Sequence, residues 1–387
     1  MIVSRKSRVI HASPSREKWG VQQGRPLYEP TVSTRFLNSG RDALVWGLNF
    51  LGDSGRLKNR TIVLPALYCG STAEHLNKYG FDIVWCEVDL DGCFSGSHLL
   101  KILKTRDVSV VIFCEFFGIS SVKNGKLKRI CNQYNVLIAF DRCHSVFSEI
   151  RDTSGVTFSV FSLRKVIEID RAGILVFHDL DFLREEIKEP LEGKLPLLHR
   201  PNFSLKLLSS AKSILKQILI SQKSINIYIL FDFMRPKRAS GNSSKVEVKS
   251  IECSLFPLSG RLADLIVDRD YLSKVVRRRR ENFRLLEQMH STKFFSNFRK
   301  LFYTRDAPQT LPLLVKNAAD FSSYLRKNGV GVYAWPAQDF PKEVQKSPEE
   351  FPNANYLHQS IVCLPVHQMI SSEDIKQIDL LVKNWQG

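Results

Sequence analysis

Residues 161–177 read FSLRKVIEIDRAGILVF, and this stretch decides the fold because it places a lysine between two apolar strands. The run FSVFS at 158–162 is predicted to be one buried strand, and ILVF at 174–177 a second. Lys165 stands where the first strand ends, and Gly173 opens the second. An amine in a partly desolvated pocket is an effective nucleophile towards an aldehyde. The alternative is a surface lysine whose alkyl stem lies on apolar atoms.

Four more apolar runs precede this stretch, and segments with helical spacing and polar faces separate them. Such alternation is typical of βαβ units. It predicts an α/β fold with a large domain, whose mainly parallel sheet is covered by helices, and a smaller C-terminal α+β domain. The four additional strand candidates are TIVL (61–64), IVWCEV (83–88), VSVVIF (108–113) and VLIAF (136–140).

The chain of 387 residues is long enough for one large core and a second, smaller lobe. We expect an N-terminal segment over 1–30 and a large α/β domain over 31–255. That domain contains a basic helical insertion at about 195–250, where the β pattern stops. The C-terminal domain is predicted over 256–387.

Composition limits the partners and the location. The net charge of +17, from 56 basic and 39 acidic residues, favours phosphorylated ligands, nucleic acid or an anionic membrane. The eight cysteines show no C-x-x-C pair and no zinc spacing, so we expect reduced thiols and no metal site. The N-terminus lacks the apolar region of a signal peptide, and no apolar run approaches the ~18 residues that span a bilayer. These features predict a cytoplasmic protein.

Two further stretches are predicted to be structural. RRRR at 277–280 lies in a long predicted helix, where the side chains fan around the axis. A solvated face is therefore favoured over a nucleic-acid patch. His367 follows a proline turn in LPVHQ, and a structural role is favoured over catalysis.

Polar residues follow the strands that flank the lysine, and ligands collect at this edge of α/β sheets. Asp141 directly follows the apolar run VLIAF, where a charged carboxylate needs a cation or several hydrogen-bond donors beside it. A turn-forming or helix-capping role is the alternative. His144 follows three residues later, and alone it is as well explained as a satisfied core histidine. Ser162, three residues before the lysine, can bind a phosphate or cap a turn.

Two upstream features add to this pattern. Ser39 and Gly40 begin an amphipathic helix, whose N-terminus can bind a phosphate or simply be capped. Tyr68 lies just past the TIVL strand, where it can contact a ligand or pack in the core.

In this order the features resemble the DegT-type (DegT/DnrJ/StrS) sugar aminotransferases, which are pyridoxal-phosphate (PLP) enzymes of fold type I. The likeness covers most of the chain except the 195–250 insertion, and the Asp141–Lys165 pair, 24 residues apart, is its most specific part. The stretches that carry it are SGRDAL (39–44), LPALYCGS (64–71), FFGIS (116–120), FDRCHS (140–145), FSLRK with RAG (161–173), RRRRENF (277–283) and LPVHQ (364–368).

The resemblance implies a role for each of these residues. Lys165 would bind the cofactor covalently and move a proton at the substrate carbon. Asp141 would keep the pyridine nitrogen protonated, so that the ring accepts electrons. The other cofactor contacts it implies are stacking by Tyr68, contact of His144 with the ring or its oxygen, and phosphate binding by Gly40, Arg41 and Ser162.

The sequence departs from the family pattern at three places. Arg41 stands where the family often has Thr or Ser. A double glycine usually follows the lysine, but here Ala172 precedes Gly173. The segment LFPLSGR at 255–261 lacks the asparagine that a neighbouring subunit supplies in the family.

The family implies amination of a keto sugar, nucleotide-linked, for polysaccharide or related glycan biosynthesis, with glutamate as amino donor and a homodimer as the assembly. One alternative is another fold type I enzyme acting on a different carbonyl substrate. Another is a non-catalytic relative with a binding or regulatory role, against which Asp141 and Lys165 argue. In the insertion, residues 203–231 form a basic amphipathic pattern that is predicted to pack on the large domain or a dimer partner; peripheral contact with an anionic membrane is the alternative.

Overall fold

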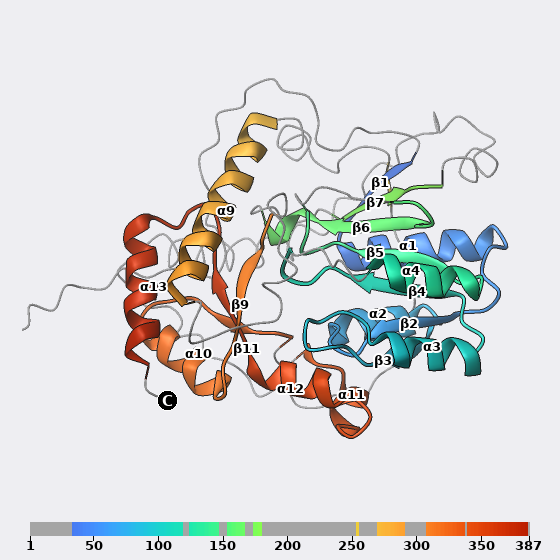
Figure 1. Ribbon diagram of the computed structural model, residues 1–387. Coiled ribbons are helices and arrows are strands. Elements are labelled where there is room, and N and C mark those ends of the chain that lie inside the picture. Colours follow the sequence, from blue (N-terminus) through green and yellow to red (C-terminus); the bar gives the residue numbers. More distant parts are fainter. Residues whose placement is uncertain are drawn as a thin grey trace, which may run out of the picture.

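The computed structural model describes residues 33–118, 124–146, 153–166, 173–179, 253–254, 269–290, 307–336 and 339–385. Within these residues the chain forms an eight-stranded and a three-stranded sheet, and Figure 1 shows the C-terminal elements gathered at one end of the larger one. The predicted fold class, α/β with a mainly parallel large sheet, is confirmed. The segments at 1–30 and 195–250 lie outside the described residues, and the predicted domain boundary at 255 stays a prediction.

The large sheet contains all six predicted strands and two that were not predicted. Five neighbouring strands run parallel, and the remaining three pair in antiparallel fashion. In spatial order the strands are β3 (Asp82–Cys86), β2 (Thr61–Pro65), β4 (Val110–Cys114), β5 (Leu137–Asp141), β6 (Phe158–Ser162), β7 (Gly173–Phe177), β1 (Thr34–Leu37) and β8 (Cys253–Ser254).

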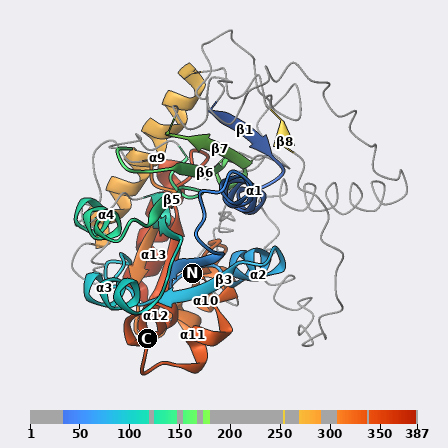
Figure 2. The ribbon, with the colours of Figure 1, turned by 90° about the vertical axis from the view of Figure 1, so that its right-hand side faces the viewer.

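Helices cover both faces of the large sheet, which explains why its strands read as continuous apolar runs. Figure 2 shows α1 (Gly40–Asp53) and α2 (Gly70–Lys78) on one face, with α3 (Gly96–Thr105) and α4 (Asn124–Gln133) on the other. Each face has its own apolar core. Among the described residues, no helix is long and apolar enough to cross a membrane.

The C-terminal part forms the second sheet, with three antiparallel strands in the order β10-β11-β9. Its apolar core packs against α9 and α13. Another group of its residues, including Phe340 and Phe351, joins the core beneath α1 and α2. The elements are α9 (Arg269–His290), β9 (Thr310–Leu314), α10 (Ala318–Lys327), β10 (Tyr333–Ala334), α11 (Lys342–Lys346), α12 (Pro352–Ser360), β11 (Ile361–Pro365) and α13 (Ser372–Asn384).

The RRRR stretch on α9 is not a solvated face throughout. Arg279 is only 1% exposed, and it donates from Nε to Gln368 Oε1 (3.1 Å) and from Nη2 to the Val166 carbonyl (3.1 Å). The prediction is therefore wrong for this residue, because neighbouring segments cover that side of α9 and offer acceptors to the guanidinium. Arg279 links α9 to the residue that follows Lys165.

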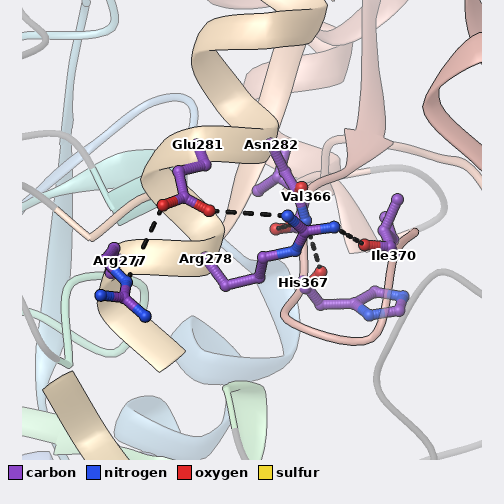
Figure 3. A network of polar contacts seen from close by, with 7 residues as sticks. All are labelled: Arg277, Arg278, Glu281, Asn282, Val366, His367 and Ile370. Atoms are coloured by element: carbon purple, nitrogen blue, oxygen red, sulfur yellow. Dashed lines mark hydrogen bonds and ion pairs between the residues drawn. The ribbon is translucent and has the colours of Figure 1, made fainter. Parts of the chain in front are cut away.

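The side of α9 next to the 366–370 loop carries a second group of polar contacts (Figure 3). Arg278 donates to the Ile370 carbonyl (3.0 Å), and Asn282 donates to the His367 carbonyl (3.0 Å). The His367 ring also accepts from the Met369 N–H (3.3 Å). His367 thus makes the structural contacts that the sequence predicts.

Candidate functional site

Asp141 and Lys165 lie at the ends of adjacent parallel strands. Asp141 is the last residue of β5 and pairs with Val160 of β6, while Lys165 ends the short 3₁₀ turn that follows β6. The charges of Asp141 and Lys165 both affect the pKa of the Cys114 and Cys143 thiols. Burial and the Asp141 charge raise the pKa of both thiols well above its ordinary value, and the Lys165 ammonium opposes this rise. The structure therefore brings the predicted pair together at the carboxyl edge of the sheet.

Both oxygens of the Asp141 carboxylate accept a hydrogen bond. The Tyr68 hydroxyl donates to Oδ2, and the Cys143 N–H donates to Oδ1 (2.9 Å). Tyr68 is 2% exposed; burial, and after it the charge of Asp141, raise the pKa of Tyr68 well above its ordinary value. The phenol is thus a protonated donor to the carboxylate, a contact that the sequence did not predict.

His144 is buried beside the pair, and its environment keeps it neutral. Burial, and after it the nearby Lys165 charge, lower the pKa of His144 well below its ordinary value. The Phe117 N–H donates to Nδ1 (3.2 Å), so the single proton of the neutral ring belongs on Nε2. His144 can therefore offer an N–H donor but no positive charge.

Aromatic rings surround the lysine, and the sequence did not predict their position. The Lys165 Nζ lies 5.7 Å from the centre of the Trp335 ring, and the His144 ring meets the same indole edge-to-face at 4.6 Å. Phe116 and Phe117, in the short turn that follows β4, pack against Trp335. Within the described residues, the buried Trp335 Nε1 has no hydrogen-bond partner. The only sequence feature that marks this residue is the WP turn at 335–336.

The backbone at the end of β4 is strained. Phe117 has a φ of 62°, in the left-handed region that residues with a side chain rarely adopt. Gly118 follows with a φ of 81°, and a Cβ there would lie 2.6 Å from the Ala307 carbonyl oxygen. Strain of this kind is concentrated at ligand sites, where the surrounding structure maintains it.

The start of α1 completes the site. Ser39 caps the helix, with its Oγ accepting from the Asp42 N–H (3.2 Å). A Cβ at Gly40 would lie 2.3 Å from Cys143 Sγ and 3.3 Å from the buried Ser162 Cβ, so the helix start sits directly on the strand ends. Arg41 follows in the first turn and is half-buried.

Gly173 explains why this approach is possible. A Cβ at this position would lie 2.1 Å from the Ser39 carbonyl oxygen and 2.9 Å from the Gly40 nitrogen. Only a glycine lets β7 begin so close to the entry of α1. Ala172, the Ile119–Ser120 end of FFGIS and the LFPLSGR segment lie outside the described residues.

The side chains present fit PLP. Lys165 supplies an amine at the strand edge, and both Asp141 oxygens keep acceptor capacity beyond their present donors. The N-terminus of the 14-residue helix α1 offers backbone N–H groups and a positive dipole end to a phosphate. A cation, an anion and an anion-binding helix end therefore meet at one edge of the sheet.

Residues 34–187 match the model of the DegT/DnrJ/EryC1/StrS aminotransferase family. The match confirms, for this segment, the family resemblance that the sequence predicts. No curated protein sequence matches the chain.

Solved structures agree with this fold over nearly the whole chain. Helicobacter pylori PseC, an aminotransferase involved in the biosynthesis of pseudoaminic acid, matches with a TM-score of 0.64 at 16% identity, over 97% of this chain and 98% of its own. S. venezuelae DesV, solved in complex with a ketimine intermediate, matches with a TM-score of 0.60 at 14% identity, over 91% of this chain and 84% of its own. 3-Amino-5-hydroxybenzoic acid (AHBA) synthase matches with a TM-score of 0.61 at 13% identity, over 90% of this chain and 85% of its own. At these identities the matches show the fold.

Proposed function

We propose that the chain is a PLP-dependent aminotransferase of the DegT/DnrJ/EryC1/StrS type that converts a keto sugar, linked to a nucleotide, into an amino sugar. Glutamate serves as the amino donor, and the product enters polysaccharide or related glycan biosynthesis. The enzyme works in the cytoplasm as a homodimer.

One observation carries the proposal: Lys165 and Asp141 occupy adjacent strand ends inside the segment that matches the family. A binding scaffold has no need of an amine and a carboxylate at this edge. Together with the capped start of α1, they provide the contacts that an aldehyde, a pyridine nitrogen and a phosphate each require.

Bound PLP supplies an aldehyde that takes up the amino group and a ring that accepts an electron pair. Lys165 Nζ holds the cofactor and moves the proton at the substrate carbon. Asp141 accepts the hydrogen bond of the ring N–H, and the Nε2–H of neutral His144 donates to an oxygen in the site. Gly40, Arg41 and Ser162 bind the phosphate at the start of α1, where the structure gathers Gly40 and Ser162.

Three observations support a phosphorylated sugar as substrate. PseC, which shares the fold, is named for the biosynthesis of pseudoaminic acid. The net charge of +17 attracts anionic ligands such as nucleotide sugars. The half-buried indole of Trp335, 5.7 Å from Lys165 Nζ and supported by the buried Phe116 and Phe117, offers apolar surface for a sugar ring.

AHBA synthase motivates the second candidate. It has the same fold and is named for an aromatic amino acid rather than a sugar. Action on a different carbonyl substrate of this kind is therefore the competing proposal.

A substrate panel separates the two candidates. Purified protein with PLP and glutamate is incubated with 4-keto and 3-keto sugars linked to UDP, dTDP, CDP or GDP, and separately with cyclic keto acids. Mass spectrometry should detect an amino sugar that forms only with glutamate and not with Lys165→Ala. Amination confined to the keto acids would favour the second candidate, and no amination of any substrate would overturn both.

A further inference from the structure

We propose that Tyr68 acts through Asp141: its hydroxyl shares the carboxylate with the pyridine nitrogen of bound PLP and limits how tightly that nitrogen holds its proton. The inference rests on the proposed function and deepens it. Tyr68 is thus a positioning residue, because it contacts the carboxylate rather than the reacting atoms. This role replaces stacking on the ring, which the family resemblance implies for it.

The contact between the two side chains is direct. The Tyr68 hydroxyl donates to Asp141 Oδ2 in a short hydrogen bond between residues 73 positions apart in the sequence. The Tyr68 ring is a member of the core beneath α1 and α2 and is almost completely buried. Water therefore cannot replace the phenol as a donor to this oxygen.

The turn that carries Tyr68 is fixed on both sides. The Tyr68 N–H donates to the Pro65 carbonyl (3.0 Å), and the Ala66 N–H donates to the Cys86 carbonyl (2.8 Å). Three residues beyond the tyrosine, the Ser71 N–H donates to Asp339 Oδ1 (2.7 Å). Because the backbone is held before and after Tyr68, the hydroxyl stays at Asp141 when a ligand enters the site.

The carboxylate can accept a further donor without losing those it has. Oδ2 accepts from Tyr68 and Oδ1 from the Cys143 N–H, and a carboxylate has about four acceptor positions. Donors to a carboxylate spread its charge, so each one weakens the bond to the next. The ring N–H consequently meets a carboxylate whose charge is already shared.

The first test needs no cofactor. Thermal unfolding of wild type, Tyr68→Phe, Asp141→Ala and the double variant forms a double-mutant cycle. Tyr68→Phe keeps the ring in the core, so the fold should persist. We expect Tyr68→Phe to destabilise the wild type clearly but the Asp141→Ala background hardly at all. Additive effects would overturn the proposal. Tyr324→Phe, in the separate C-terminal core, is the matched control and should show no coupling to Asp141→Ala.

The second test reads the ring nitrogen itself. Protein is reconstituted with PLP carrying an isotopic label at the pyridine nitrogen, and nitrogen NMR follows its protonation with pH. Tyr68→Phe should raise the midpoint by about one pH unit, because the carboxylate then has one donor fewer and gives more of its charge to the ring. PLP affinity should stay within about threefold, since the shape of the site is unchanged.

The outcomes separate this inference from the proposed function. An unchanged or lowered midpoint in Tyr68→Phe, with PLP bound normally, overturns the role of Tyr68 and leaves the aminotransferase proposal standing. Failure of wild-type protein to bind PLP overturns both, whatever the unfolding cycle shows.

Discussion

At the scale of single residues, Gly173 determines whether the site can form. A Cβ there would overlap the backbone of Ser39 and approach that of Gly40, and neither is a flexible side chain that can move aside. The glycine lets the strand that follows the lysine lie against the start of the helix that is proposed to bind phosphate. The sequence places this glycine at the start of a predicted strand, and the structure shows why no larger residue fits there.

Gly173→Ala should therefore destabilise the protein by about 1–3 kcal/mol, as overpacking in a tight core does. It should also weaken PLP binding, because the start of α1 must move. Chemical denaturation and a PLP titration measure the two effects. Gly125→Ala is the matched control: a Cβ at this exposed position on α4 meets nothing within 4 Å. Equal effects of the two substitutions would contradict the close approach.

At the scale of elements, two carboxylates join the large sheet to the C-terminal part in reciprocal fashion. Asp339 accepts from the N–H and the hydroxyl of Ser71 (both 2.7 Å), in the first turn of α2. Glu87, after β3, accepts from the N–H groups of Asn353 (3.0 Å) and Ala354 (3.2 Å), at the start of α12. Each part thus supplies the N-terminal cap for a helix of the other.

Asp339→Ala should cost about 1–3 kcal/mol, since half-buried donors at the start of α2 lose their acceptor. It should also loosen the turn that carries Tyr68, two residues before this helix begins. Urea unfolding gives the free energy, and hydrogen exchange of the Ser71 amide reports the local opening. Asp320→Ala, at the exposed start of α10, removes a carboxylate from another first turn and should change stability by less than ~0.5 kcal/mol. An unprotected Ser71 amide in the wild type would contradict the cap.

The sequence predicted the elements whose signals are local. Six strands of the large sheet were predicted because buried strands are continuous apolar runs in the sequence. The ends of two of these runs then indicated Asp141 and Lys165 as candidate site residues. The four-residue strand β1 was missed, since TRFL carries too short a pattern. Trp335 and Arg279 were missed for a different reason. Their roles depend on which segment of the folded chain lies beside them, and no local pattern encodes that.

At the scale of the whole molecule, buried and half-buried histidines whose pKa is lowered in the fold make stability depend on pH. Burial, and after it the charge of Arg142, lower the pKa of His178 from 6.5 to about 4. Burial also lowers the pKa of His98, His358 and His144 below the ordinary value. Below pH 6.5 the unfolded chain binds protons that the folded chain does not, so stability declines as the pH falls.

For His178 this decline should run from pH 6.5 to about 4. Each such histidine contributes a slope of at most about 1.4 kcal/mol per pH unit. Urea unfolding at a series of pH values measures it. His178→Gln keeps a polar partner for Ser159 Oγ, which lies 2.8 Å from His178 Nε2, and should give a shallower slope than wild type. A slope as steep as that of wild type would show that His178 titrates normally in the folded chain.

Lys165 is the residue proposed to hold PLP. Reduction of the PLP-loaded protein with borohydride, followed by digestion and mass spectrometry of the peptides, tests this role. We expect the reduced pyridoxyl group on the peptide that contains Lys165, and no labelled peptide from Lys165→Ala treated in the same way. A label on a different lysine, or on none although PLP is bound, would contradict it.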